Sequence, residues 1–347
     1  MAISLRHRII GAGLTAVAAS RADLWLAPLA RGLGAILTFH HVRPQRADGF
    51  RPNALLEITP EHLDGTLELV RRLGLEIVPL DAVPDRLTRG EGGFVALTFD
   101  DGYRDNRDHA LPVLRRHGAP WTMFVTTDFA SGRGSLWWVE LEEAIRASDR
   151  IVFDGRVLPC GTSQEKDAAF AALYADLRAG PEPRLREATA RLCEEAGIDR
   201  ARLVPDLCLS WSELDALAAS ENAPAIGAHT LTHPMLARWD EATARREITE
   251  PKAAIEEKLG SPVRHLAYPV GDPGSAGFRE FAIAREAGYA TAVTTRPGHL
   301  FAGHAAHLTA LPRVSINGLY QTEAATRALL SGVPFLAWNR GRRLNVG

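Results

Sequence analysis

Short apolar runs alternate with segments of helical periodicity along most of the chain, and this alternation is the feature that most restricts its fold. Runs rich in Val, Ile, Phe and Thr, separated by helical patterns, are typical of βαβ units with parallel strands. We therefore predict an α/β fold built on a mainly parallel sheet or barrel. The predicted strands are residues 35–39, 94–99, 121–126, 224–228, 265–268, 290–294 and 311–316. The predicted helices include residues 105–117, 240–259 and 277–287.

The strand rhythm is lost between residues 131 and 220. Segments rich in Glu, Arg and Ala, such as residues 183–196, predict surface helices there, so we interpret this region as a helical insertion. Trp137, Trp138 and Trp211 lie near its two ends. Their rings could either stack on a ligand or pack the insertion onto the core, and the sequence leaves both interpretations open.

Composition excludes several classes of function. With 347 residues and 46% apolar content, the chain can bury a substantial core without disulfide bonds. Forty basic and 42 acidic side chains give a net charge of -2, so we expect no nucleic-acid partner. The three cysteines show no C-x-x-C spacing, which argues against a disulfide framework and against a thiolate zinc site. None of these features determines the oligomeric state.

Both ends of the chain differ from the predicted domain, which we place at residues 34–335. In residues 1–33, two arginines precede an apolar stretch that ends in small residues, which is the outline of a signal peptide. Two glycines in that stretch and its amphipathic continuation favour a helix that packs on the domain or lies on a membrane surface. We therefore expect a cytoplasmic or membrane-peripheral protein rather than a secreted one. No apolar run is long enough to span a membrane, and residues 336–347 form a basic tail.

The strongest chemical signal is a strand that ends in two carboxylates and a glycine. Residues 94–99 have the composition of a buried strand, and Asp100, Asp101 and Gly102 follow directly. Ligands bind at the carboxyl ends of parallel strands, and adjacent side chains of an extended segment point to opposite sides. One carboxylate can thus bind a metal ion while the other acts as a general base. The alternative interpretation is a simple turn with a helix N-cap.

A second signal is a pair of histidines, His229 and His233, directly after another predicted strand. Two histidines four residues apart can converge on one cation if the segment takes a single helical turn. An isolated pair of this kind is more often incidental. Together with Asp101, however, the pair makes a common catalytic zinc set, two imidazoles and one carboxylate, with coordination positions left open.

These segments resemble motifs of the polysaccharide deacetylases, the NodB-homology or carbohydrate esterase 4 family. Residues 98–102 and 229–234 look like the first two motifs, and residues 266–271 resemble the third motif in an alanine-tyrosine variant. The resemblance extends over roughly residues 34–331. It implies a distorted, incomplete (β/α) barrel of the NodB type, with about seven strands and a helical insertion.

The resemblance also implies an activity and a set of site residues. The family removes acetyl groups from N-acetylated glycans with the help of a divalent metal ion, and we expect zinc. Asp101, His229 and His233 would be the metal ligands, and Asp100 would be the base that activates water. An N-acetylated glycan is accordingly the expected substrate, whether an exopolysaccharide, a chitin-like oligomer, peptidoglycan or a lipid-linked sugar.

Other matching positions concern the oxyanion and the base. The main-chain N–H of Val270 would help to bind the oxyanion, and Tyr103 and Arg313 would contact the oxyanion or the substrate. The family often has an arginine in the third motif to orient the base, but Ala267 stands at that position here. Arg264 or Arg313 could take its place.

A histidine near the start is the candidate general acid, because the C-terminal Leu-x-His of many members is missing here. Residues 36–42 resemble a segment of the deacetylases that act on poly-N-acetylglucosamine exopolysaccharide, in which an N-terminal histidine takes the acid role. The resemblance implies that His40 protonates the leaving amine. Alternatively, His40 or His41 is a structural histidine hydrogen-bonded under the strand ends.

Three other functions remain compatible with the sequence. A metal-independent glycoside hydrolase would pair Asp100 or Asp101 with a distant acid such as Glu140 or Glu213. A non-catalytic carbohydrate-binding relative would keep the metal site but lack turnover. A peptidase or another amidase on the same scaffold is a weaker hypothesis.

Overall fold

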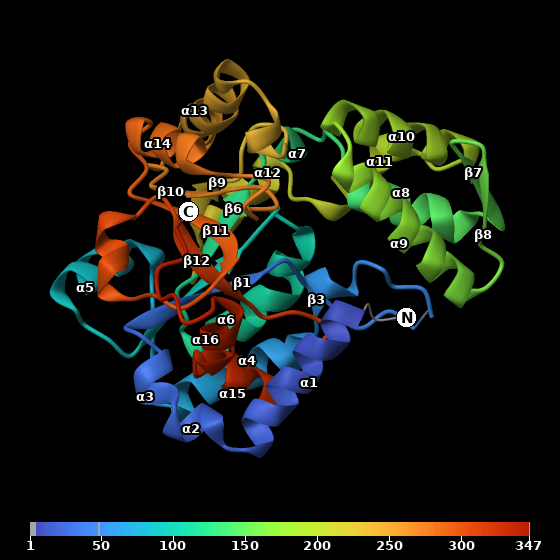
Figure 1. Ribbon diagram of the computed structural model, residues 1–347. Helices are drawn as coiled ribbons and strands as arrows, with labels where there is room; N and C mark the ends of the chain where they lie inside the picture. Colours follow the sequence, from blue (N-terminus) through green and yellow to red (C-terminus); the bar gives the residue numbers. More distant parts are fainter. Residues whose placement is uncertain (1–4, 48, 347) are drawn as a thin grey trace.

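The computed structural model describes residues 5–47 and 49–346, and its centre is a barrel of parallel strands (Figure 1). Seven strands pair in the order β1-β12-β11-β10-β9-β6-β5, and β5 pairs with β1, which closes the barrel. The predicted (β/α) barrel is confirmed, with seven strands where a complete barrel of this class has eight. The barrel strands are β1 (Gly34–Phe39), β5 (Phe94–Phe99), β6 (Thr122–Val125), β9 (Ala225–Ala228), β10 (His265–Ala267), β11 (Thr291–Pro297) and β12 (Leu311–Ser315).

Five shorter strands were not predicted. β4 (Glu76–Val78) pairs with the first half of β5, and β6 pairs with the second half along the same edge of β5. Two short strands at the mouth of the barrel pair with each other, β2 (His41–Val42) and β3 (Glu57–Ile58). The last two form an antiparallel hairpin in the insertion, β7 (Arg150–Phe153) and β8 (Arg156–Pro159). Segments of two to four residues are too short to show a period of two in the sequence.

Every second side chain of a strand points into the barrel. These inward side chains are apolar at the amino ends of the strands, which form the floor, and polar at the carboxyl ends, which form the mouth. Phe94 and Ala96 of β5 pack inside the barrel, whereas Val95 and Leu97 of the same strand pack against the outer helices. Thr98 continues the inward series, and Asp100 follows it immediately beyond the end of the strand. The other apolar residues of the floor are Ile36, Phe124, Ala267, Val293 and Leu311.

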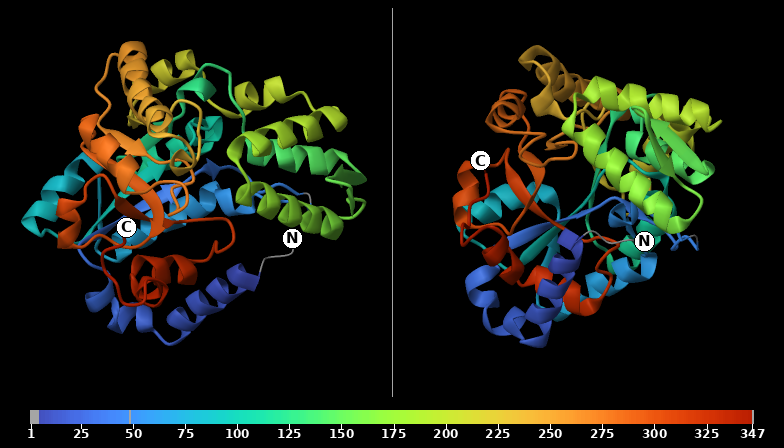
Figure 2. Two further views of the ribbon diagram at one scale, coloured as in Figure 1. Left: turned by 45° about the horizontal axis from the view of Figure 1, so that its top comes forward. Right: turned by 45° about the vertical axis from the view of Figure 1, so that its right-hand side comes forward.

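Helices surround the barrel (Figure 2), and capping residues fix where several of them begin. Thr59 caps the helix that follows β3, Asp240 caps the long helix that follows β9, and Gly260 ends the latter in the left-handed conformation. The outer α-helices are α4 (Pro60–Arg72), α5 (Val83–Arg89), α6 (Leu111–His117), α7 (Thr127–Ala130), α12 (Trp211–Ala218), α13 (Glu241–Leu259), α14 (Phe278–Glu286), α15 (Glu323–Leu330) and α16 (Val333–Trp338). Short 3-10 or π turns are η1 (Ala54–Leu56), η2 (Leu80–Ala82), η3 (Asn106–Ala110), η4 (Leu236–Arg238) and η5 (Ala302–Ala306).

Four helices and the β7–β8 hairpin form a subdomain at one side of the barrel, drawn in green in Figure 1. It has its own hydrophobic cluster, separate from that of the barrel, and Trp137 and Trp138 are buried in this cluster. These two rings therefore pack the subdomain onto the core and do not stack on a ligand. Trp211 is half-buried and donates its indole N–H to Ser131 Oγ at 2.9 Å. The helices are α8 (Trp137–Ala147), α9 (Ser163–Ala179), α10 (Glu182–Glu195) and α11 (Arg200–Leu207).

Three N-terminal helices pack beside α15 and α16 below the barrel (Figure 1). Leu14 contacts Ala325 and Ala328 of α15, and the buried carboxylate of Asp23 pairs with Arg327. Within the part of the chain that the structure describes, no helix has the length and apolar character needed to cross a bilayer. The three helices are α1 (Leu5–Ala19), α2 (Ala22–Trp25) and α3 (Ala27–Ala30).

Close packing inside the barrel leaves no room for a side chain at Gly227. A Cβ added to Gly227 of β9 would lie 2.5 Å from Phe124 Cδ1 and 3.0 Å from the carbonyl oxygen of His265. We expect Gly227→Ala to lower the free energy of unfolding by roughly 1–3 kcal/mol, because the ring of Phe124 and the neighbouring strand would have to move. Urea unfolding followed by circular dichroism measures the change.

Gly65 in α4 is the matched control for this substitution. It is exposed, and no heavy atom lies within 4 Å of an added Cβ. Gly65→Ala should therefore raise the free energy of unfolding by about 0.5–1 kcal/mol, since alanine is the better helix former. Equal effects of the two substitutions would contradict the close packing at Gly227.

Candidate active site

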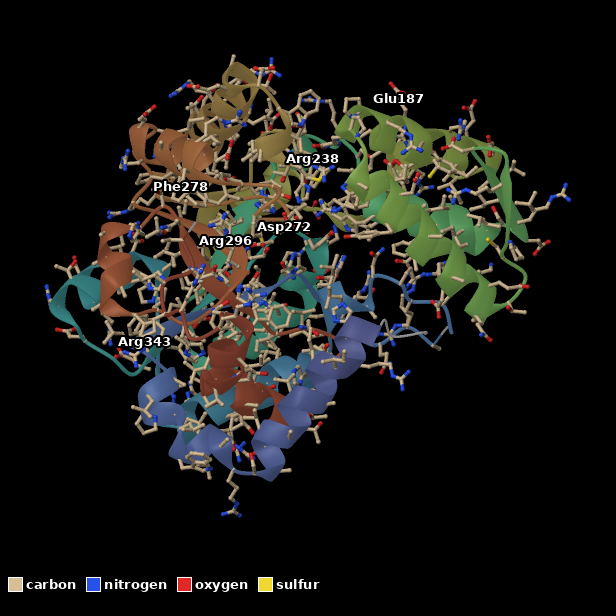
Figure 3. All side chains as sticks on the ribbon, in the orientation of Figure 1. Glu187, Arg238, Asp272, Phe278, Arg296 and Arg343 are labelled. Atoms are coloured by element: carbon tan, nitrogen blue, oxygen red, sulfur yellow. The ribbon has the colours of Figure 1, made fainter. Side chains whose placement is uncertain are left out.

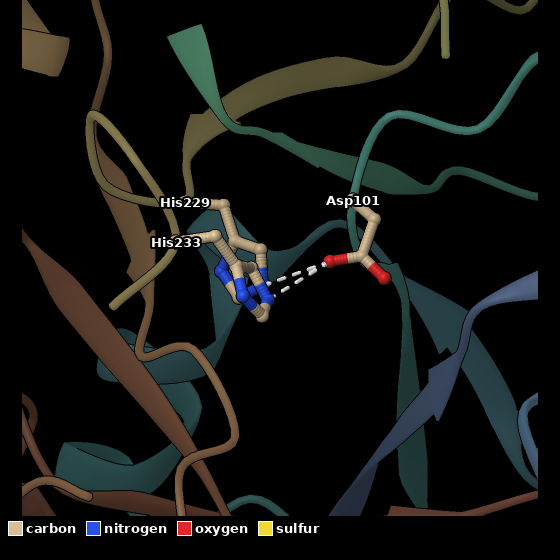
Figure 4. Close-up of side chains that lie close together, drawn as sticks. All are labelled: Asp101, His229 and His233. Atoms are coloured by element: carbon tan, nitrogen blue, oxygen red, sulfur yellow. Dashed lines mark ion pairs between the residues drawn. The ribbon is translucent and has the colours of Figure 1, made fainter. Parts of the chain in front are cut away.

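Three side chains predicted to bind one metal ion converge at the mouth of the barrel (Figure 4). Asp101 follows β5, and His229 and His233 follow β9, so all three come from the carboxyl ends of strands. Asp101 Oδ1 lies 3.3 Å from the Nε2 atom of each histidine. One candidate ligand atom from each residue lies within 4.8 Å of the others, and all three side chains are buried. The group could hold a metal ion.

The loop that carries the two histidines does not form the helical turn on which the prediction depended. It is a bent segment in which Thr230 and His233 both have positive φ, of 65° and 61°. Thr230 Oγ1 accepts a hydrogen bond from the backbone N–H of His233 at 3.0 Å. This turn brings both imidazoles to the same side by backbone bending, which the sequence spacing alone could not indicate.

Glu247 of α13 holds this loop, and sequence reasoning missed it. Its side chain is buried and accepts hydrogen bonds from the backbone N–H groups of Leu231 and Thr232, and from the Thr232 hydroxyl, at 2.8–3.0 Å. The signal was present in the sequence. Glu247 lies three residues after Ala244 on the inward face of a predicted helix, where a carboxylate needs partners.

Hydrogen bonding fixes the tautomer of His229. Its Nδ1 lies 2.7 Å from the carbonyl oxygen of Ala267, which can only accept, so Nδ1 carries the proton. The Nε2 atom of the neutral ring therefore presents a lone pair toward Asp101. Burial raises the pKa of Asp101, but the two imidazoles outweigh this effect and the net pKa is well below its usual value. Asp101 is accordingly an anionic candidate ligand.

Asp100 points into the barrel and forms a bidentate ion pair with Arg313 of β12. The guanidinium donates to both carboxylate oxygens, at 2.7 and 2.6 Å. It also donates to Thr98 Oγ1 at 3.1 Å and to the carbonyl oxygen of Thr294 at 2.8 Å. Burial raises the pKa of Asp100, but the charge and hydrogen bonds of Arg313 lower it by more, so the net pKa is below its usual value. Asp100 is thus held anionic in one orientation.

The two arginines left open by the sequence lie in different places. Arg313 is fully buried against Asp100, whereas Arg264 precedes β10 at the other end of the barrel and pairs with Asp81 at 2.8 Å. Arg313 is therefore the arginine that contacts the candidate base. Because its guanidinium is enclosed, its side chain has no surface for the oxyanion or substrate contact predicted from the resemblance.

His40 and His41, adjacent in sequence, have different environments. The side chain of His40 is 21% exposed, and its Nε2 lies 3.9 Å from Asp100 Oδ2, beyond hydrogen-bond distance. Burial is the main effect on His40 and lowers its pKa. His41 is buried, its Nδ1 lies 2.6 Å from Asp105 Oδ2, and its ring stacks on Tyr103. Only His40 is oriented toward the group of predicted site residues.

Tyr103 lies behind the site. Its side chain is fully buried, and its hydroxyl accepts a hydrogen bond from Trp138 Nε1 at 3.2 Å. The ring of Trp138 in turn contacts His233, with a centroid distance of 4.8 Å. The side chain of Tyr103 therefore supports the site from behind. It does not present a surface to a substrate, although the resemblance implied that it would.

Val270 follows β10 and has a strained backbone. Its φ is 60°, and the N–H of Gly271 donates to the carbonyl oxygen of Pro269 at 2.6 Å, which makes a γ-turn centred on Val270. Such conformations are unfavourable for a β-branched residue. Of the eight non-glycine residues with positive φ in the described chain, four lie in the segments that form this site: Asp101, Thr230, His233 and Val270. Strain of this kind concentrates at functional sites.

The carboxylates needed by a metal-independent glycoside hydrolase are engaged elsewhere. Glu213 accepts from Arg104 and Arg107 and caps α12, and the hydrogen bonds from Arg104 are the main reason that its pKa is lowered. Glu140 is buried in the subdomain with Thr189 and Arg200. The carboxyl acid of such an enzyme must stay protonated and reach the substrate, whereas Glu213 has a lowered pKa and Glu140 is enclosed in the subdomain.

One family model matches the part of the chain that carries the first two motifs. The family model described as polysaccharide deacetylase matches residues 88–151 and 188–292, which contain Asp100, Asp101 and both site histidines. His40 and Arg313 lie outside the matched segments. A search of curated protein sequences finds no match.

Several solved structures share the fold. A Streptococcus pyogenes deacetylase, PplD, in complex with acetate is 19% identical, with a TM-score of 0.55, and the match covers 82% of this chain and 92% of that one. A polysaccharide deacetylase from Bacillus cereus is 16% identical, with a TM-score of 0.53 and coverage of 86% and 68%. IcaB from Ammonifex degensii is 19% identical, with a TM-score of 0.50 and coverage of 85% and 96%. At these identities the likeness establishes the fold alone.

The matched segments contain the first two motifs, and the structure places those motifs together at the mouth of a barrel. The chain therefore matches the polysaccharide deacetylase family over the segments that carry these site residues, and it is a hydrolase of the carbohydrate N-deacetylase class.

Proposed function

We propose that this chain hydrolyses the N-acetyl amide of an N-acetylated polysaccharide or oligosaccharide and releases acetate, with zinc as its cofactor. The observation that carries the proposal is the environment of Asp101 Oδ1. This buried oxygen has no hydrogen-bond partner among the described residues, and it faces two imidazole nitrogens at 3.3 Å. A buried anionic oxygen without a donor is costly, so the geometry fits a cation.

The chemistry of the donors supports zinc. Two imidazoles and one carboxylate are a frequent catalytic zinc set, and the Ala267 carbonyl orients one imidazole as such sites require. Asp101, His229 and His233 would hold the ion. When bound there, zinc would supply Lewis-acid chemistry, polarising the acetamide carbonyl and lowering the pKa of a water molecule.

Proton transfer is assigned to Asp100 and His40. Asp100 takes the proton from the attacking water, because Arg313 keeps it anionic while each carboxylate oxygen retains a free lone pair. His40 donates a proton to the leaving amine nitrogen, and its partial exposure at the mouth gives it access to substrate. The strained turn at Val270 supports an oxyanion contact by its main-chain N–H.

A non-catalytic carbohydrate-binding role is less well supported. Its support came from the missing arginine of the third motif and the missing C-terminal histidine. Arg313 contacts the candidate base in place of that arginine, and His40 is available as the proton donor. An acetate-release assay on N-acetylglucosamine oligomers, exopolysaccharide and peptidoglycan tests the proposed activity. Release from none of them would overturn it.

Loss of the ion should abolish turnover. We expect dialysis against a chelator to stop acetate release and added zinc to restore it. Replacing a residue that only hydrogen-bonds to a metal ligand typically weakens metal binding by roughly 10–100-fold. Asp101→Ala and His233→Ala should each weaken zinc binding by more than this. Elemental analysis of the purified chain measures zinc content independently of activity.

His117 offers a control, since it is largely buried against Asp64 at the end of α6, away from the site. His117→Ala should leave the zinc content unchanged. Full activity in a chain shown to contain no metal would rule out the cofactor.

A substitution at Asp100 should separate proton transfer from metal binding. Asp100→Asn keeps the size and a hydrogen-bonding oxygen but cannot accept the proton, so we expect kcat to fall by about 10²–10⁴-fold while zinc stays bound. Acetate release and elemental analysis give the two readouts. Asp81→Asn makes the same change at the other end of the barrel and should have no effect on rate. Equal rates for Asp100→Asn and the unaltered chain would remove Asp100 from the mechanism.

A general acid matters most when the leaving group is basic. We expect His40→Ala to retain zinc and to reduce kcat on N-acetylated glycans by about 10²–10⁴-fold, because an amine must be protonated to leave. The same variant should lose much less activity on an aryl acetate ester, whose phenolate leaves without a proton. His307→Ala, on the exposed surface, is the control. Equal losses on both substrates would show that His40 acts otherwise.

A further inference from the structure

The outer surface of the three N-terminal helices carries a cluster of exposed apolar side chains. We call this cluster the N-terminal apolar face, and it consists of Ile9, Ala12 and Ala16 of α1, Leu24 and Trp25 of α2, and Leu29 of α3. The four large members are strongly exposed, Ile9 by 63%, Leu24 by 50%, Trp25 by 64% and Leu29 by 60%. Soluble surfaces seldom gather large apolar groups in one short stretch without a partner.

Helix α1 is apolar on both sides. Its inner side places Ile10, Leu14 and Val17 against α15. Its outer side repeats small or apolar residues at helical spacing, at positions 9, 12, 13 and 16, and all four are exposed. A helix at a water-facing surface normally has a polar outer side, so this one is suited to an apolar environment on its outer side as well.

Polar groups on this surface bond within their own segment. The hydroxyl of Thr15 donates to the carbonyl oxygen of Gly11 at 2.9 Å, and that of Ser20 donates to Ala16 at 2.7 Å. The indole N–H of Trp25 donates to the carbonyl oxygen of Ser20 at 3.3 Å. Groups already bonded in this way lose little when water is removed, which lowers the cost of burying the surface.

Charge identifies the kind of surface that fits. The only acidic residue between positions 5 and 33 is Asp23, which is buried and paired with Arg327, while Arg8 and Arg21 are exposed. The C-terminal tail adds the exposed Arg340, Arg342 and Arg343 and no acid. Arg343 Nη2 donates to the carbonyl oxygen of Leu29 at 3.4 Å, so this tail lies beside α3 (Figure 3). A chain with a net charge of -2 thus concentrates positive charge around its apolar face.

We propose that the N-terminal apolar face docks on the surface of an anionic lipid bilayer. Trp25 and its aliphatic neighbours enter the interfacial zone, and the surrounding arginines contact lipid headgroups. The part of the face on α2 and α3 lies at the opposite end of the barrel from the site residues, because α3 leads directly into the amino end of β1. Helix α1 runs from there toward Tyr320, in the loop that follows the carboxyl end of β12. Docking through Leu24, Trp25 and Leu29 of α2 and α3 therefore leaves the catalytic mouth open to a glycan. The proposal does not depend on the catalytic assignment.

Vesicle co-sedimentation of the full chain tests the proposal. We expect binding to vesicles of phosphatidylcholine with about a third phosphatidylglycerol, and much weaker binding to phosphatidylcholine alone or in high salt. Trp25→Glu combined with Leu29→Glu should reduce binding by at least about tenfold, because it removes apolar area and adds negative charge. Circular dichroism and activity on a soluble substrate should be unchanged, since both side chains are exposed and far from the site.

Phe278→Glu provides a matched control, because Phe278 is 72% exposed on α14. It removes an exposed aromatic ring and adds the same charge elsewhere, and it should leave vesicle binding unchanged. Equal loss in this control, or no binding to anionic vesicles, overturns the proposal. So does a dimer in light scattering that Trp25→Glu with Leu29→Glu dissociates, because the face would then bind a second copy of the chain.

Discussion

The buried ion pair between Arg313 and Asp100 is the interaction on which the rest of the site depends. Two charges enclosed in protein are stable only when their geometry is good and further hydrogen bonds surround them. Here every guanidinium nitrogen bonds, to the two oxygens of Asp100, to Thr98 Oγ1 and to the Thr294 carbonyl. Arg313 lies in β12, and Asp100 directly follows β5. These two strands are the neighbours of β1 in the barrel. The pair therefore requires a closed barrel, and the closed barrel in turn fixes the orientation of the base.

Adjacent carboxylates acquire different roles because the backbone turns at Asp101, just beyond the end of β5. Asp100 continues the inward series of β5 and meets an arginine, whereas Asp101 takes a positive φ and turns toward two imidazoles. Strained backbone at His233 and Val270 aims the other two loops at the same centre. The loops can hold this strain because they are tied to the frame, one by Glu247 and the other by Thr295, whose hydroxyl donates to the Val270 carbonyl.

The helical subdomain also contributes to the site, through packing. Trp138 connects its hydrophobic cluster to His233 and Tyr103, so the insertion covers one side of the candidate ligands with aromatic surface. Phe129 stacks on the same histidine. An apolar, water-poor wall strengthens electrostatic interactions in the site, which favours both cation binding and a fixed base.

By itself, the sequence determined the class of fold, the seven barrel strands and the residues of the first two motifs, because strand composition and motif spacing are local properties. Short strands such as β4 and the subdomain hairpin were not predictable, since two to four residues carry no usable periodicity. Only the tertiary structure decided which arginine meets Asp100, that Tyr103 is buried, and that a bent loop, not a helical turn, brings His229 and His233 together. The Arg313–Asp100 contact joins residues 213 positions apart, and barrel closure creates such contacts, which local sequence does not encode.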